Sequence, residues 1–309
     1  MAKSKQKNKA SDSAKQKEKQ KKRDAKNRGS KSGKSKDNKA KKAAKPPIAE
    51  NADKYDLYQR SVQSPETEVK MLRRAYKHAY GEYPVRLRED FCGAAAVCVE
   101  WVRKAPSAEA WGVDLDPEPL AWGDEHNAIT LKDAQRERLH LVEGDVRTAR
   151  TPKADVIAAQ NFSFYCFKQR AELLKYFKAA RRHLSEQGVL VLDMLGGPAV
   201  MDDEQIEDKS VDDFQYFWEQ ETFDPISHDA LFHIHFQFKD GSRLDKAFSY
   251  DWRLWSLPEV RDLLLEAGFR DVVVYWEGAD DEGYGNGVFS RRKKAPADHC
   301  WLAYVCGVK

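Results

Sequence analysis

Short apolar runs alternate with amphipathic stretches through the middle of the chain, and acidic residues follow three of these runs. The runs lead to Glu89-Asp90, to Asp114 and to Glu143-Gly144-Asp145. The stretches between them, residues 96–104 and 119–136, have the periodicity of helices. This alternation predicts a β-α-β-α-β unit with an acid at the carboxyl end of each strand. Ligands of open α/β sheets bind at that edge, where a carboxylate suits a ribose diol or an adenine amino group. The spacing therefore indicates a nucleoside-bearing ligand.

The alternation continues to about residue 197 and then breaks. The apolar run Val189–Leu195 is typical of a buried parallel strand. Beyond Gly196-Gly197-Pro198 the pattern favours antiparallel strands, with a hairpin turn signal at Asp240-Gly241. A short aromatic segment, 55–58, precedes the first helix. The pattern predicts strands at 85–90, 110–114, 139–145, 154–159, 189–195, 215–223, 231–238, 243–250, 271–277 and 301–308, helices at 64–80, 96–104, 119–136, 168–184 and 257–267, and a Gly- and Asp-rich loop at 278–287.

Charge is divided unevenly along the 309 residues. Residues 1–46 hold 17 Lys and 2 Arg against 4 acids and no aromatic residue, which predicts a disordered Lys-rich tail. That tail carries a net charge of +15, so the formal total of +3 leaves −12 for residues 47–309. The body is expected to be one α/β domain with an antiparallel insertion, 196–257, acting as a lid. The tail could attach weakly to RNA or another polyanion by counterion release.

The five cysteines, Cys92, Cys98, Cys166, Cys300 and Cys306, are odd in number and form no CxxC pair. They lie in apolar runs, so free buried thiols in a reducing compartment fit best. The sequence has no apolar stretch approaching a membrane span and no secretory h-region. We therefore expect no membrane partner and a cytoplasmic location, or a nuclear one in a eukaryote.

Three acidic positions are candidate ligand contacts, each with a structural alternative. The turn Phe91-Cys92-Gly93-Ala94-Ala95 has small residues that let a backbone approach a ligand, although an ordinary tight turn explains it equally well. Asp114 suits a ribose diol. It could instead cap the following helix, but Asp116 fills that role better. Asp145 could be a simple turn residue.

The order and spacing of these segments resemble a class I S-adenosylmethionine-dependent methyltransferase. The resemblance rests on residues 87–101, 112–117, 143–145 and 154–197, and on the closing segment 258–309. It implies a Rossmann-like, mostly parallel seven-stranded sheet of order 3-2-1-4-5-7-6, with S-adenosyl-L-methionine as cofactor. The implied cofactor contacts are Glu89 or Asp90, Phe91, Cys92 and Gly93 for the methionine part, Asp114 and Leu115 for the ribose, Asp145 and Val146 for the adenine, and Gln160 and Asn161 near the sulfonium.

One segment departs from the family pattern. The usual D-x-G-x-G-x-G is Glu89-Asp90-Phe91-Cys92-Gly93-Ala94-Ala95 here, so two glycines are missing. Because Ala is expected to replace Gly only where φ is negative, we expect the loop path to differ in detail. Either Glu89 or Asp90 can then be the ligand.

Candidate contacts to the methyl acceptor lie after the fourth strand and in the insertion. Gln160-Asn161-Phe162-Ser163-Phe164-Tyr165 lacks the Pro-Pro of enzymes that methylate nucleic-acid amino groups, and so looks more like small-molecule members. Asn161 and Tyr165 are candidates to position a nucleophile, unless they form a capped loop with core aromatics. If a base is needed, Asp193, His233 and His235 are candidates. His233 and His235 alternate on one strand, but no third ligand at a recognisable spacing supports a metal site. Candidate substrate contacts are Tyr58, Tyr250, Trp252 and Arg253.

The sequence favours methyl transfer to an N or O nucleophile of a small molecule or peptide. An RNA- or ribosome-directed methyltransferase is the alternative that the basic tail suggests. A non-catalytic S-adenosylmethionine-binding protein and a nicotinamide dehydrogenase are the remaining hypotheses.

Overall fold

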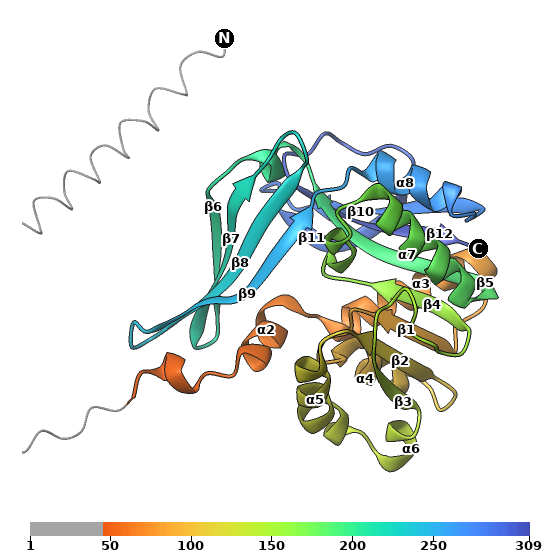
Figure 1. Ribbon diagram of the computed structural model, residues 1–309, viewed down its shortest axis with the longest axis horizontal. Helices are drawn as coiled ribbons and strands as arrows, with labels where there is room; N and C mark the ends of the chain where they lie inside the picture. Colours follow the sequence, from red (N-terminus) through yellow and green to blue (C-terminus); the bar gives the residue numbers. More distant parts are fainter. Residues whose placement is uncertain (1–45) are drawn as a thin grey trace, which may run out of the picture. The chain divides into compact units, whose positions relative to one another are not determined.

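The computed structural model describes residues 46–309, so the tail predicted at 1–46 lies almost entirely outside the described residues. An eight-stranded sheet forms the centre, in the order β11-β10-β12-β5-β4-β1-β2-β3 (Figure 1). Strands β1 to β5 pair in parallel, whereas β12, β10 and β11 pair antiparallel. The strands are β1 (Arg86–Asp90), β2 (Glu109–Asp114), β3 (Leu139–Glu143), β4 (Ala154–Ala159), β5 (Leu184–Gly196), β10 (Asp271–Ala279), β11 (Gly285–Arg292) and β12 (Trp301–Val308).

Seven of these strands have the predicted order. The eighth, β11, was not predicted. β11 pairs with β10 at the sheet edge, in a segment whose first residues were expected to be loop. Gly285 and Gly287 both lie in β11, and glycine in a strand weakens the sequence signal for it. A register shift between Glu277 and Ala279 accompanies the pairing.

Helices cover both faces of this sheet, because side chains alternate across each strand. Val156 and Ala158 of β4 pack with α3 and α4, whereas Ile157 and Ala159 pack with α7 and α8. The helices are α3 (Pro65–Tyr80), α4 (Ala96–Arg103), α7 (Arg170–His183) and α8 (Leu257–Glu266). The result is a three-layer α/β core. The carboxyl ends of β1, β2 and β4 meet at one edge of its sheet.

Two helical predictions need correction. The stretch expected as one helix at 119–136 is divided into α5 (Pro117–His126), η2 (Ala128–Thr130) and α6 (Asp133–Arg136). The backbone becomes extended at Leu131 and Lys132, which ends the helical path. The segment around 55–58 is a helix, α2 (Lys54–Val62), whose N-cap Asp53 accepts the backbone N–H of Tyr55 and Asp56.

The insertion between β5 and α8 is a four-stranded antiparallel sheet, β6-β7-β8-β9 (Figure 1). Its strands are β6 (Gln205–Val211), β7 (Phe214–Phe223), β8 (Asp229–Phe238) and β9 (Arg243–Arg253). The prediction missed β6, since nearly all of its side chains are exposed and polar and give no alternating pattern. Leu57 of α2 packs against Phe214, Ile234 and Phe236 of this sheet, so the helix supports the insertion.

Candidate active site

The loop after β1 has left-handed backbone at three alternating positions. Phe91, Gly93 and Ala95 have φ of 59°, 51° and 55°. These are the three positions at which the motif that the sequence resembles has glycine. Ala95 therefore contradicts the expectation that Ala replaces Gly only where φ is negative. Phe91 and Ala95 hold a conformation that costs a non-glycine residue about 1–2 kcal/mol. The surrounding packing therefore fixes this loop: Asn127 Nδ2 donates to Ala94 O over 2.9 Å.

The two acids at the end of β1 have different environments. Asp90 pairs with Arg88 Nε at 2.6 Å, both side chains being fully buried, and accepts the hydroxyl of Tyr176 at 3.0 Å. Glu89 occupies the first position of the motif, is 4% exposed, and accepts the backbone N–H of Cys98 at 3.1 Å. Asp90 is therefore committed to the core, and Glu89 is the candidate ligand contact.

Asp114, at the end of β2, joins two neighbouring segments. Its Oδ2 accepts the N–H of Gly93 at 2.7 Å and its Oδ1 accepts that of Asp116 at 3.0 Å. Asp116 caps α5 by accepting the N–H of Glu118. Each oxygen of Asp114 keeps a second lone pair, which suits the two hydroxyls of a ribose. Leu115, beside it, is 71% exposed and gives this edge an apolar surface.

Asp145, after β3, already has a charged partner. Arg147 Nε lies 3.0 and 3.1 Å from its two carboxylate oxygens, and this hydrogen bonding lowers the pKa of Asp145. Arg147 also stacks on the ring of Phe167. An adenine amino group could reach Asp145 only beside Arg147 or in its place. The sequence did not indicate that Arg147 contacts Asp145. Val146 is buried, as a residue packing under a purine would be.

The loop after β4 is fixed by Asp193 of β5. Asn161 and Phe162 both have positive φ, and their N–H groups donate to the carboxylate of Asp193 at 2.8 and 2.9 Å. Asp193 is therefore a positioning residue for this loop rather than a free base. Gln160, just before it, is 5% exposed, and its Oε1 has no partner in the described part of the chain.

Buried carboxyl groups gather around these strand ends. Burial raises the pKa of Glu89 to about 8, of Glu68 to about 7 and of Asp193 to about 6. Repulsion between Glu68 and Glu89, and between Asp193 and Glu68, adds to these shifts. Glu68 Oε2, like Gln160 Oε1, lacks a partner among residues 46–309. Unsatisfied buried acceptors beside acids fit a ligand that brings positive charge and N–H donors.

Sequence reasoning missed Glu68, although a signal was present. Glu68 lies on α3 on the same helical face as Leu72, Ala75 and Tyr76, all of which are buried. An acid in the apolar stripe of an amphipathic helix faces the interior.

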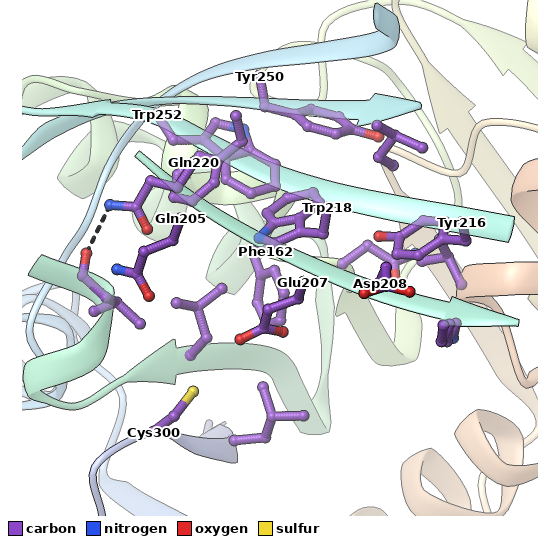
Figure 2. A pocket seen from close by; sticks show the side chains of 18 of the residues that line it. Phe162, Gln205, Glu207, Asp208, Tyr216, Trp218, Gln220, Tyr250, Trp252 and Cys300 are labelled. Atoms are coloured by element: carbon purple, nitrogen blue, oxygen red, sulfur yellow. Dashed lines mark hydrogen bonds between the residues drawn. The ribbon is translucent and has the colours of Figure 1, made fainter. Parts of the chain in front are cut away.

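A cavity of about 380 Å³ lies between the insertion and the strand ends (Figure 2). The insertion supplies most of its aromatic side chains, and β5, η4 (Pro198–Met201) and the start of β12 supply aliphatic ones. Its volume is within the range of small-molecule sites. The lining residues are Tyr58, Val62, Asn161, Phe162, Leu195, Ala199, Val200, Gln205, Glu207, Asp208, Lys209, Tyr216, Trp218, Gln220, Phe232, Ile234, Tyr250, Trp252, Cys300 and Leu302.

Some predicted acceptor-side residues line this cavity and others do not. Asn161, Tyr58, Tyr250 and Trp252 do. Tyr165 is fully buried and donates its hydroxyl to Leu195 O.

Three more candidates lie elsewhere. Arg253 stacks on Trp255, pairs with Glu259 and donates to Lys168 O. His233 and His235 alternate with the cavity residues Phe232 and Ile234, so they face the opposite side of the sheet. There His233 contacts Ser249 and Glu221, and His235 contacts Glu219 and Asp245. No group of three or more His, Cys, Asp or Glu within 46–309 is placed to hold a metal ion.

The cysteine prediction is correct in part. Cys92, Cys98 and Cys306 are buried, but Cys166 and Cys300 are exposed, and Cys300 borders the cavity. All five are free thiols. None of the helices within the described range has the length and apolarity needed to cross a lipid bilayer.

Comparison with known proteins identifies the fold. No protein-family model and no curated protein sequence matches the chain. A S-adenosylmethionine-dependent methyltransferase from Clostridium acetobutylicum aligns with 81% of this chain and 96% of its own, at TM-score 0.58 and 19% identity. The S-adenosylmethionine-bound amino pentose methyltransferase CalS10 from Micromonospora echinaspora aligns over 82% and 95%, at 0.58 and 16%. The sugar N-methyltransferase KedS8 from Streptoalloteichus aligns over 89% and 98%, at 0.54 and 18%. The chain therefore has the Rossmann-like fold of S-adenosylmethionine-dependent methyltransferases.

Proposed function

We propose that the protein transfers a methyl group from S-adenosylmethionine to an N or O nucleophile of a small molecule or peptide. The observation that carries this proposal is the set of buried carboxyl groups around the loop after β1. S-adenosylmethionine bears a sulfonium and an ammonium group, and its ribose diol matches the carboxylate of Asp114. Glu68, Glu89 and Gln160 would take up the positive end, and Leu115 and Val146 would contact the adenine.

The cofactor supplies a methyl group already activated by positively charged sulfur. The chain contributes alignment and exclusion of water, which can account for much of the rate increase of such a reaction. Asp193 holds the Asn161-Phe162 loop, which follows β4 and lines the cavity. The aromatic lining of the cavity keeps the nucleophile in an apolar setting.

The size and aromatic lining of the cavity support a small acceptor rather than a nucleic acid. A pocket of about 380 Å³ holds a compact molecule. CalS10 and KedS8, which share the fold, are described as acting on sugars. Any polyanion contact through residues 1–46 remains a separate proposal.

Two measurements test the proposal. Calorimetry should show binding of S-adenosylmethionine and S-adenosylhomocysteine but not of NAD. Labelled cofactor should then transfer label to the small-molecule fraction of a cell extract. Thermal stabilisation by NAD alone would sink the proposal. Tight cofactor binding without transfer to any fraction would favour a non-catalytic binding protein, and label lost from RNA on deletion of residues 1–45 would favour an RNA-directed enzyme.

A further inference from the structure

The chemistry of the acceptor cavity is asymmetric, and this asymmetry indicates what the cavity holds. We propose that the acceptor carries a cationic amine as a recognition group on an apolar, ring-bearing body. The ring packs on the aromatic wall of the insertion, and the positive charge lies near the carboxylate of Glu207 on β6. The nucleophile is a different N or O atom of the same molecule, because an ammonium group has no lone pair to accept a methyl group. This inference rests on the proposed function, because it names the acceptor class of the same site.

The aromatic wall consists of Trp218, Phe232, Tyr250 and Trp252, and Figure 2 shows most of it along one side of the cavity. Ring centroids are 4.5 Å apart for Tyr250 and Trp252, 5.0 Å for Trp218 and Phe232, and 5.9 Å for Trp218 and Tyr250. Leu195, Val200 and Leu302 contribute aliphatic surface to the lining. A flat body can stack on such a wall, and the faces of Trp and Tyr also attract cations.

Two amide side chains present oxygen to the cavity. Gln220 is 5% exposed, and its Nε2 donates to Val200 O at 2.9 Å (Figure 2). The Nε2 of Gln205 donates to the carbonyl oxygens of Ala199 and Asp202. Because the Nε2 atom of each amide donates to the segment around η4, the carbonyl oxygen of each is available to a ligand. Carbonyl oxygens accept hydrogen bonds, as an ammonium group requires.

The charged groups on the cavity face of β6 are Glu207 and Lys209. They pair in register with Trp218 and Tyr216 of β7 and so share the face of these aromatic side chains. Asp208 pairs with Phe217 and lies on the opposite face, with His235. Lys209 donates to Ser61 O and lies 5.3 Å from the ring centroid of Tyr216. Its ammonium group is thus engaged by the protein, whereas the exposed carboxylate of Glu207 makes no ion pair or side-chain hydrogen bond within residues 46–309.

The remaining polar groups of the lining are neutral. Burial raises the pKa of Tyr58, Tyr216 and Tyr250, so their phenols stay protonated. Asn161 and the indole N–H groups can serve any polar ligand. The carboxylate of Glu207, the two amide oxygens and the aromatic faces together favour a positively charged ligand over a neutral or negative one.

Three probes that share an indole ring test this inference: tryptamine, 3-(2-hydroxyethyl)indole and indole-3-acetate. At pH 7 they are cationic, neutral and anionic, respectively. Binding to the full-length protein saturated with S-adenosylhomocysteine is measured by calorimetry. We expect tryptamine to bind at least about tenfold more tightly than indole-3-acetate, with the alcohol between them. Glu207→Gln should reduce the tenfold difference to about twofold or less.

A matched control keeps net charge equal. Glu282→Gln removes one charge from the exposed turn after β10, and it should leave the preference unchanged. Trp218→Leu should weaken all three probes together. Three outcomes would overturn the inference: equal or tighter binding of the alcohol or the acetate, failure of all three to bind, or an equal effect of the control variant. If the cofactor binds and label is transferred while the amine preference fails, only the acceptor class is wrong. If S-adenosylhomocysteine does not bind, the proposed function fails first.

Discussion

The backbone N–H of Gly93 donates to Asp114 Oδ2 over 2.7 Å, which ties the loop after β1 to the end of β2. The same carboxylate is the candidate ribose contact, so one side chain shapes the loop and contacts the ligand.

Asp114→Ala should weaken S-adenosylmethionine binding by at least about tenfold, since a charge-assisted hydrogen bond is worth about 1.5–3 kcal/mol. Calorimetry measures the dissociation constant. Asp116→Ala is the matched control: it removes the cap of α5 and should cost about 1 kcal/mol of stability without a comparable loss of affinity. An unchanged dissociation constant for Asp114→Ala would exclude this residue from the site.

Asp90→Ala should lower the free energy of unfolding by about 3–5 kcal/mol, because it leaves the fully buried Arg88 without its ionic partner. Denaturant unfolding measures this change. The double variant Arg88→Met with Asp90→Leu should recover much of the loss, because neither charge is then buried alone. If Asp90→Ala is as stable as the parent protein but binds cofactor poorly, Asp90 rather than Glu89 is the ligand contact.

Stability of the ligand-free protein should fall as pH rises from about 4.5 to about 8. Burial raises the pKa of Glu89 from 4.5 to about 8, so between these values the folded protein binds more protons than the unfolded chain, and folding is favoured at the lower pH. The stabilisation is complete below the unfolded pKa and is lost as pH passes the folded one. Urea unfolding at several pH values measures the slope.

Glu89→Gln should make this pH dependence shallower, because among Glu89, Glu68 and Asp193 it removes the acid whose pKa is raised most. Glu186→Gln, whose side chain is 95% exposed, is the control and should leave the slope intact. A slope in Glu89→Gln equal to that of the parent would show that Glu89 titrates normally.

Gly123→Ala should weaken cofactor binding without touching the ligand. A Cβ at Gly123 of α5 would lie 2.4 Å from Ala94 O and 2.9 Å from Ala94 Cα, so the loop after β1 must move. At Gly144 the added Cβ would meet only Ala149 Cβ, at an ordinary 3.5 Å, which makes Gly144→Ala the matched control. We expect a reduced affinity and a lower melting temperature for the first variant and a small change for the second. Equal behaviour of the two would contradict the close packing of α5 on the loop.

Much of the central sheet follows from the sequence, because each buried parallel strand is an apolar run and each connection has helical periodicity. β6 and β11 did not follow, since polar side chains in one and glycines in the other erase the alternation that marks a strand.

The site residues divide in the same way. Because Asp114 stands at the end of a predicted strand, the sequence indicated that it lies at the sheet edge beside the loop after β1. The spacing of charges could not show that Arg88 lies beside Asp90, that Arg147 covers Asp145 or that Asp193 holds the loop after β4. These pairings depend on side-chain directions that only the packed fold determines.

One amide side chain connects the two halves of the site. Asn127 donates to Ala94 O in the loop after β1 and exchanges hydrogen bonds with Gln59 of α2. The same helix places Tyr58 in the cavity lining and supports the insertion. A replacement at 59 or 127 would leave a partner amide unsatisfied, so substitutions at these positions should be tolerated in pairs rather than singly. Among related chains we therefore expect the identities at 59 and 127 to change together, which would make this contact visible as covariation between sequences.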